Sequence, residues 1–269
     1  MPYTISFQKK KKRVVHFKIA EIPYLNCAPF YWKKDLKNFA TIPCSPKKMG
    51  LLAKRKKIDA GPISLVDSFE LEEEYEELEG LGIAVKNRAK SVLLFSKRPI
   101  QSLFNATIGL SDHSVTSICL LKLLLEKKYK IKAKFHLGFK NKDDAQLYIG
   151  DAALKKNSQN GFKTITDLGD EWFKWQKLPF VFARWMVRKE LSSKAKELIA
   201  EWLKTNLDSC GEKKIQAIQW FKKKYDWDYP KAQEYLQGFQ YHLGKKEKKA
   251  ISVFKTFCNE NSTLFYSNN

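Results

Sequence analysis

The side chains best suited to chemistry lie in one stretch, Thr107–Leu125, with the sequence TIGLSDHSVTSICLLKLLL. A short apolar run there leads into a hydroxyl-rich loop and then into an almost wholly apolar helix. The start of a helix has backbone N–H groups without intrahelical partners and a partial positive charge, so it can hold a carboxylate or phosphate. Asp112 or Ser114 is suited to cap the helix, and Ser114, Thr116 and Ser117 add hydroxyl donors. The stretch therefore predicts either an anion site or an ordinary capped helix.

His113 is the titratable side chain of this loop with the widest chemical use. It could serve as a general acid or base, or donate to a neighbouring backbone group. Asp112, His113 and Ser114 have the composition of a hydrolase triad, but three consecutive residues cannot adopt its geometry. The histidines show no metal-ligand spacing, so we expect no metal ion and no cofactor.

The composition favours a globular protein that handles small anions. The 269 residues are 43% hydrophobic, enough for one large core or two modest ones. The net charge of +21 raises the question of nucleic acid, a membrane surface or an anionic ligand. Lysine is scattered between apolar positions instead of forming one stripe, and no zinc-finger or RNA-recognition motif is present. Nucleic-acid binding is therefore disfavoured.

The cysteines and the termini indicate a cytoplasmic protein. The five cysteines are odd in number, widely spaced and never arranged as CxxC, which favours reduced thiols. No run approaches the ~18 apolar residues of a membrane span, and the N-terminus lacks the apolar core of an export signal. We expect no membrane contact, and we expect residues 1–15 to form a basic N-terminal extension.

The first part of the chain predicts a βαβ unit. An apolar strand at Val14–Ala20 leads into the loop Glu21–Phe30, where Asn26 offers both a donor and an acceptor. Loops after strands are where α/β proteins bind ligands, although an asparagine in a turn can equally bond its own backbone. A helix at Pro46–Lys57 and a strand within Ile58–Phe69 complete the unit.

The middle of the chain predicts a second set of strands. One is Thr107–Leu110, and another ends at Gly150, where the missing side chain permits a close approach. Asp151 then holds a loop or caps a helix that starts near Ala152. A half-exposed strand is predicted at 131–139, with its odd-numbered apolar residues facing inward. The acidic run Glu70–Gly80 is predicted to be a solvated surface element, because carboxylates this dense repel one another.

Two strand-like crossovers, near Ser91–Ser96 and Leu178–Trp185, predict a middle lobe inserted into a discontinuous first lobe. The predicted division gives residues 16–93 and 183–269 to lobe 1 and residues 94–182 to lobe 2. Apolar spacing and turn residues predict the later helices. These are Thr166–Lys177, an amphipathic helix through residues 195–203, Gly211–Tyr225, Asp228–His242 and Lys245–Cys258.

Seven stretches taken together resemble one family, the menaquinone-biosynthesis chorismate dehydratases of the futalosine route. They are IPYLNCAPF (Ile22–Phe30), IDAGPIS (Ile58–Ser64), SVLLFS (Ser91–Ser96), SDHSVTSICLLKLLL (Ser111–Leu125), LYIGDAAL (Leu147–Leu154), DLGDEWFKWQKLPFVFARW (Asp167–Trp185) and YLQGFQYHLG (Tyr235–Gly244). The resemblance implies an α/β, periplasmic-binding-protein-like (type II) fold with a ligand cleft between two lobes. It also implies a carbon–oxygen lyase that removes water from chorismate, a small-molecule substrate, to give 3-[(1-carboxyvinyl)oxy]benzoate.

The resemblance also assigns the residues of the cleft. The implied substrate contacts are Asn26, Ser91, Ser114, Thr116, Ser117, Gly150 and Asp151. Asn26 and Ser91 would position the substrate for catalysis.

No family motif in this chain presents a clear Glu, Lys or His base. We therefore hypothesise that the enolpyruvyl carboxylate of the substrate takes the proton, with His113 as the rival base. Two other functions stay open: a non-catalytic binding protein for small anions, and the sister enzyme that forms 1,4-dihydroxy-6-naphthoate.

Overall fold

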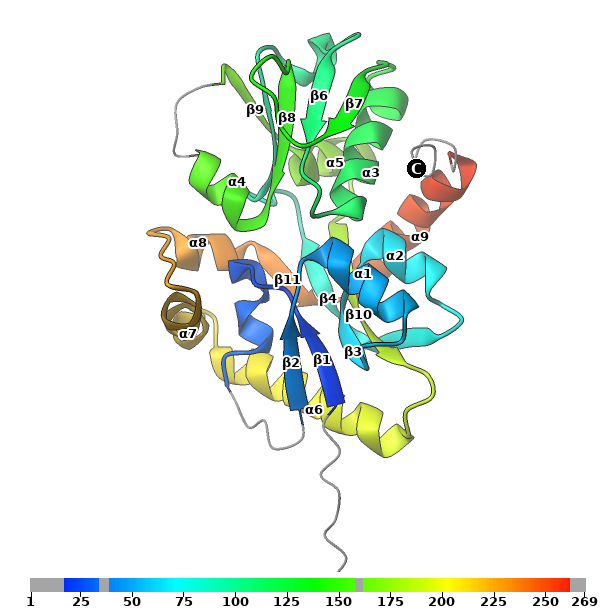
Figure 1. Ribbon diagram of the computed structural model, residues 1–269, viewed down its shortest axis with the longest axis vertical. Coiled ribbons are helices and arrows are strands. Elements are labelled where there is room, and N and C mark those ends of the chain that lie inside the picture. The colour runs from blue at the N-terminus through cyan, green and yellow to red at the C-terminus, as the bar shows by residue number, and fades with distance from the viewer. Residues whose placement is uncertain (1–16, 34–38, 158–161, 262–269) are drawn as a thin grey trace, which may run out of the picture.

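The computed structural model describes residues 17–33, 39–157 and 162–261. The predicted extension at 1–15 and the start of the predicted strand Val14–Ala20 lie outside these ranges. The described chain forms two α/β lobes, each built around one sheet (Figure 1). None of the helices in the described ranges is both long enough and apolar enough to span a bilayer.

Lobe 1 is built on a six-stranded sheet with the order β11-β4-β10-β3-β1-β2. Its strands are β1 (Phe17–Glu21), β2 (Phe39–Pro43), β3 (Ala60–Ser64), β4 (Tyr75–Val85), β10 (Phe180–Arg188) and β11 (Phe239–His242). β1 pairs in parallel with β2 and β3, whereas β10 runs antiparallel to β3 and β4. The helices are η1 (Leu25–Phe30, a 3-10 helix), α1 (Pro46–Lys54), α2 (Leu65–Glu70), α6 (Ser193–Cys210), α7 (Ile215–Tyr225), α8 (Ala232–Gln237) and α9 (Lys245–Glu260).

Lobe 2, green in Figure 1, is built on a five-stranded sheet with the order β7-β6-β8-β5-β9. Its strands are β5 (Val92–Ser96), β6 (Thr107–Leu110), β7 (Lys134–Leu137), β8 (Ala145–Ile149) and β9 (Thr164–Asp167). β6 pairs in parallel with β7 and β8, and β5 runs antiparallel to β8 and β9. The helices are η2 (Ile100–Ser102), α3 (Val115–Leu123), the π-turn η3 (Leu124–Lys128), α4 (Gly150–Asn157) and α5 (Leu168–Gln176).

The chain passes between the two sheets at residues 86–91 and 177–179. β5 pairs with β8 and β9 in the sheet of lobe 2, and β10 pairs with β3 and β4 in that of lobe 1. The predicted boundaries after residues 93 and 182 fall inside these two strands. The domain division itself stays a prediction; in chain order, the strands of the five-stranded sheet lie between β4 and β10.

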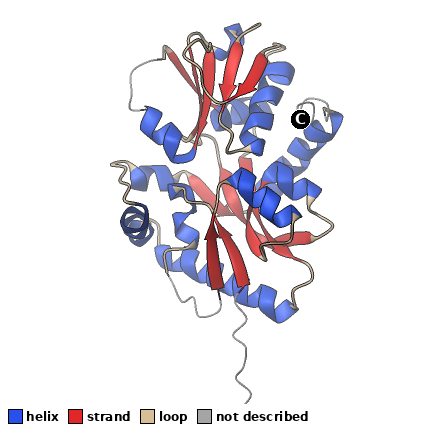
Figure 2. Cartoon of the chain, in the orientation of Figure 1, coloured by secondary structure: helices blue, strands red, loops and turns tan. Residues whose placement is uncertain are grey.

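Helices pack around both sheets and enclose the apolar residues (Figure 2). In α6, Ile199 and Leu203 are fully buried one helical turn apart, as the amphipathic pattern predicts. The side chain of Ser192 caps this helix by accepting a hydrogen bond from the backbone N–H of Ala195. Local sequence and packing thus agree for the elements that support the site.

The predicted helix Asp228–His242 is wrong in its second half. α8 ends at Gln237, and β11 then pairs with the edge of β4. Phe239 and Tyr241 are buried while Gln240 and His242 are exposed, which is the two-residue period of a strand. The helical spacing of the preceding residues conceals this period because β11 is only four residues long.

The acidic run Glu70–Gly80 is not a detached surface element. It closes α2 and begins β4, where Tyr75 and Leu78 are buried. Basic side chains neutralise its carboxylates: Glu72 pairs with Arg184 at 2.9 Å and with Lys255 at 2.5 Å. Ion pairing relieves the mutual repulsion and allows an acidic segment to join the sheet.

Two further predictions in lobe 2 need correction. The predicted strand at 131–139 shrinks to β7, an edge strand, and Leu137 and Phe139 are 59% and 41% exposed instead of facing inward. The predicted helix Thr166–Lys177 begins only at Leu168, because Thr164–Asp167 forms β9. Asp167 ends the strand and caps the helix by accepting from the N–H groups of Gly169 and Asp170.

Candidate active site

The carboxyl ends of parallel strands from both lobes meet at one cavity. β1 and β3 lead there into η1 and α2, while β6 and β8 lead into α3 and α4. This is the edge of parallel sheets at which α/β proteins bind ligands. The walls enclose about 540 Å³ of space when the open solvent at the mouth is counted.

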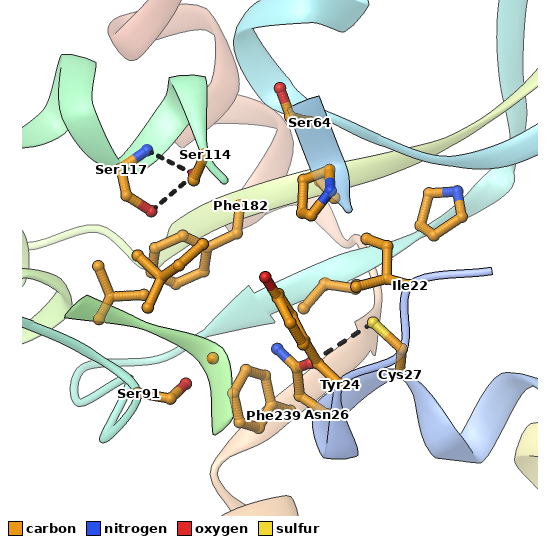
Figure 3. A pocket seen from close by; sticks show the side chains of 17 residues that line it. Ile22, Tyr24, Asn26, Cys27, Ser64, Ser91, Ser114, Ser117, Phe182 and Phe239 are labelled. Atoms are coloured by element: carbon orange, nitrogen blue, oxygen red, sulfur yellow. Dashed lines mark hydrogen bonds between the residues drawn. The ribbon is translucent and has the colours of Figure 1, made fainter. Parts of the chain in front are cut away.

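Both lobes contribute to the lining, and none of the described lining residues carries a charged side chain (Figure 3). The lining residues are Ile22, Tyr24, Asn26, Cys27, Pro46, Pro62, Ser64, Ile83, Ser91, Val92, Ser114, Ser117, Ile149, Gly150, Phe182, Ala183 and Phe239. Apolar side chains form most of this surface, and a few hydroxyl and amide groups converge on it. Such a cavity binds an anion through hydrogen-bond donors and not through ion pairs.

Asn26 is held with its amide nitrogen toward the cavity (Figure 3). The thiol of Cys27 donates to Asn26 Oδ1 at 3.4 Å, and the hydroxyl of Tyr241 donates to the Asn26 backbone carbonyl at 2.9 Å. These bonds fix both ends of the residue, so the side-chain N–H₂ group remains available to a ligand.

The start of α3 forms the opposite wall. Ser114 caps the helix, since its Oγ accepts from the backbone N–H of Ser117 at 3.2 Å and donates to Ser117 Oγ at 3.0 Å. This resolves the open choice between Asp112 and Ser114 as the cap. The N–H groups of Val115 and Thr116 occupy the first helical turn, where no intrahelical acceptor exists. The wall therefore presents backbone donors together with the hydroxyl hydrogen of Ser117.

Two other hydroxyls of the lining are engaged with protein groups. Ser64 donates to the buried carboxyl of Asp67 at 2.7 Å. Ser91 accepts from the hydroxyl of Tyr235 at 2.7 Å, and its own hydrogen bond to Ala89 O is 3.4 Å long. Both serines are held in fixed orientations by these partners.

Hydrogen bonds join the two lobes on both sides of the cavity. On the α3 side, the N–H of Lys47 donates to the carbonyl of His113 at 3.2 Å, and the N–H of Val66 donates to Thr116 Oγ1 at 3.2 Å. On the α4 side, the N–H of Leu25 donates to Asp151 Oδ1 at 3.1 Å. Thr116 and Asp151 thus bridge the lobes behind the lining.

Asp151 holds the first residue of η1, Leu25, within the predicted loop Glu21–Phe30, which is one of the two roles foreseen from the sequence. Burial raises the pKa of its carboxyl to about 7, opposed by the hydrogen bond from Leu25 and by the charge of Lys155. The neutral acid is favoured because a buried carboxylate loses its hydration. The adjoining Gly150 has a φ of +58°, and a Cβ there would lie 2.9 Å from ring atoms of Tyr24. Glycine at 150 therefore permits the ring of Tyr24 to pack against lobe 2.

His113 does not line the cavity. Its ring lies in a neighbouring surface hollow, 3.4 Å from Asp112 Oδ1, and its side chain is 55% exposed. The contribution of His113 to the site is its backbone carbonyl, which accepts from Lys47.

The sequence prediction missed several residues of the lining. Asn26, Ser91, Ser114, Ser117 and Gly150 are brought together as expected. Tyr24, Ser64, Phe182 and Phe239 were not foreseen as part of the site. Tyr24 was detectable as a neighbour of Asn26 in the loop after β1, whereas Phe239 depends on the missed strand β11.

Residues 17–260 match the sequence profile of a family described as menaquinone biosynthesis. The chain belongs to this family. It is also 26% identical to the chorismate dehydratase of Thermus thermophilus over 252 residues, which cover 86% of this chain and 91% of that protein. The predicted family is therefore confirmed.

Solved structures with low sequence identity share the fold. A protein from Archaeoglobus fulgidus has a TM-score of 0.70 at 15% identity and covers 92% of this chain and 98% of its own. The periplasmic aliphatic sulphonate binding protein of Escherichia coli has a TM-score of 0.67 at 12% identity, with coverage of 92% and 87%. The predicted periplasmic-binding-protein-like fold is thus confirmed.

Proposed function

We propose that this protein is a chorismate dehydratase, a hydro-lyase that converts chorismate into 3-[(1-carboxyvinyl)oxy]benzoate in the futalosine route to menaquinone. One observation carries the proposal: an uncharged cavity between the lobes at which Asn26, Ser91 and the start of α3 converge. The family and the similarity to a chorismate dehydratase support it.

The donors of the two walls suit a dianion with two separated carboxylates. The start of α3, with Ser117 and the free backbone N–H groups, is suited to the ring carboxylate, on which negative charge builds when the ring C–H bond breaks. Across the cavity, the amide of Asn26 is suited to the enolpyruvyl carboxylate. Fixed donors of this kind stabilise developing charge without reorganising during the reaction.

The reaction does not need a strong base from the protein. It removes the ring hydroxyl and the hydrogen on the carbon that bears the ether, and the gain of aromaticity drives it. The described lining holds no Glu, Asp, Lys or His side chain, which supports the enolpyruvyl carboxylate as the proton acceptor. Asn26 would hold that carboxylate beside the C–H bond, and the bridged lobes would keep water out.

Incubation with chorismate, followed by liquid chromatography and mass spectrometry, tests the proposal. We expect a product 18 mass units lighter than chorismate, by the loss of one water, that co-elutes with authentic 3-[(1-carboxyvinyl)oxy]benzoate. Tight binding of chorismate without turnover would instead identify a binding protein. The sulphonate-binding protein of Escherichia coli, which has a similar fold, is a binding protein of this kind. Turnover of cyclic dehypoxanthine futalosine alone would identify the sister enzyme.

A further inference from the structure

The hydroxyl of Tyr24 is bonded to none of the described residues, whereas each serine hydroxyl of the lining has a hydrogen-bond partner. Figure 3 shows it pointing from the η1 wall into the open space toward Phe182. Ser64, Ser91 and Ser114 each donate to a protein acceptor. Among the hydrogen bonds of the described residues, none involves the Tyr24 hydroxyl.

The fully buried tyrosines of the protein obey the usual rule that a buried phenol finds a partner. Tyr31 donates to Ala20 O at 2.9 Å, Tyr75 to Ile58 O at 2.7 Å, and Tyr241 to Asn26 O at 2.9 Å. Tyr24 is only partly buried, and its unpartnered hydroxyl faces the open space of the cavity, where a ligand can accept a hydrogen bond from it.

The ring of Tyr24 is fixed in place. Its backbone N–H donates to Ile22 O at 2.9 Å, and its carbonyl accepts from the N–H of Cys27 at 2.9 Å. The ring packs against Gly150 of lobe 2, and the next residue, Leu25, is bonded to Asp151. A donor held this firmly is preorganised for a reacting atom.

We propose that Tyr24 is a catalytic residue whose hydroxyl protonates the ring hydroxyl of the substrate as that group leaves. This inference rests on the proposed dehydration of chorismate. The departing oxygen needs a proton to leave as water. The η1 wall offers two side-chain donors, and since Asn26 is assigned to the enolpyruvyl carboxylate, Tyr24 is left to donate to the departing oxygen.

The proton balance closes within the site. The ring C–H bond breaks, its proton passes to the enolpyruvyl carboxylate, and its electron pair forms the new ring double bond as the C–O bond breaks. The proton of Tyr24 joins the departing oxygen to give water. The carboxylic acid then returns a proton to the tyrosinate, which restores both groups.

The surroundings keep Tyr24 protonated until it is needed. Burial, and next the charge of Asp151, raise the pKa of the Tyr24 hydroxyl well above its usual value. The phenol therefore stays protonated at neutral pH and is available to donate its proton to the departing oxygen.

Tyr24→Phe tests the role. We expect kcat to fall about 10²-fold or more while the Kd for chorismate changes less than about threefold, because only proton donation is lost. A chorismate analogue with fluorine in place of the ring hydroxyl has a leaving group that needs far less protonation. For this analogue the ratio of wild-type to variant rates should drop below about 10.

Tyr31→Phe is the matched control, since it removes a buried hydroxyl that is bonded within lobe 1. We expect it to lower Tm and leave kcat unchanged, whereas Tyr24→Phe should lower kcat and leave Tm unchanged. If wild-type protein forms the product and Tyr24→Phe retains kcat within about fivefold, or shows the same ratio for both substrates, the inference falls and the proposed function stands. A wild-type protein that forms no product from chorismate overturns both.

Discussion

The η1 wall and the α3 wall of the cavity both follow the carboxyl end of a parallel strand, but they present different groups. The α3 wall offers backbone N–H groups and short hydroxyls that bond one another. The η1 wall offers two longer side chains, Tyr24 and Asn26, that reach into the space from a fixed backbone. This contrast suggests a division of labour: the α3 wall binds charge, and the η1 wall acts on the reacting atoms. Substitutions on the two walls should accordingly affect different kinetic constants.

The largest effect is expected from Asn26→Asp. The substitution keeps the size of the side chain, removes its donor and adds a negative charge that repels a dianionic substrate. Loss of one fixed donor costs about 10²-fold to 10³-fold in kcat, and the added charge should take kcat/KM lower still. Steady-state kinetics of Asn26→Asp and Asn26→Ala would measure both contributions. An increase in KM without a loss in kcat would place Asn26 with the α3 wall and break the contrast.

A smaller loss is expected from Gly150→Ala, which disturbs the η1 wall from the other lobe. The new Cβ would lie 2.9 Å from the ring of Tyr24 and displace it. A misplacement of about 1 Å at a reacting group can lower kcat about 10²-fold. Gly138→Ala is the control, because Gly138 also has a positive φ, +78°, but has open space around it. Equal kinetic losses in both variants would show that backbone strain, and not Tyr24, is responsible.

On the α3 wall, Ser117→Ala should lower kcat/KM about tenfold, through a higher KM and a modest fall in kcat, because a hydrogen bond to a charged group contributes about 1.5 kcal/mol and the charge on this carboxylate grows during the reaction. Ser114→Ala sharpens the test. It removes the helix cap as well, so it should also lower the free energy of unfolding by about 1 kcal/mol. Titration calorimetry and thermal unfolding would separate the two effects. A large fall in kcat for Ser117→Ala would argue against a purely binding role for this wall.

The bridge between the walls should respond to pH through Asp151. Its folded pKa of about 7 exceeds the value of about 3.9 in an unfolded chain, so the native state retains a proton that the unfolded chain has released. The resulting stability is complete below about pH 4 and is lost as the pH rises through about 7. Asp151→Asn cannot titrate, and its Tm should fall less than that of the wild type between pH 5 and pH 8. Asp208→Asn, at an exposed position of α6, should behave as the wild type does.

The smallest effect is expected at His113, whose ring lies outside the cavity. His113→Ala should retain kcat within about threefold, because its backbone carbonyl still accepts from Lys47. A loss of about 10²-fold would identify His113 as the base and would move the proton transfer to the α3 wall.

Much of the site was predictable because its parts are local. Ser114 lies directly before an apolar helix, and Gly150 directly follows a buried strand, so the neighbouring residues in the sequence predict both positions. Asn26 follows a strand in the same way. Such residues are fixed by short-range rules of capping and strand endings.

The parts that were missed depend on long-range pairing. Phe239 enters the lining because β11 adds to the edge of β4, more than 150 residues away in the chain. The acidic segment leads into the same strand because Arg184 and Lys255 form ion pairs with Glu72. Tyr24 gains its significance only when Gly150 of the other lobe packs on its ring. These contacts join residues that are far apart in the chain, so local patterns in a single sequence do not predict them.

Because Cys27 is buried in the cavity, the rate at which its thiol is chemically labelled can report how often the lobes separate. Its thiol lies in the lining of the cavity at 1% exposure, and burial raises its pKa well above the usual value. Alkylation requires both access and a thiolate, so reaction of Cys27 with a maleimide should occur only in molecules whose lobes have separated. The rate of labelling would then report the opening equilibrium, and a bound ligand that holds the lobes together should slow it in proportion to its occupancy.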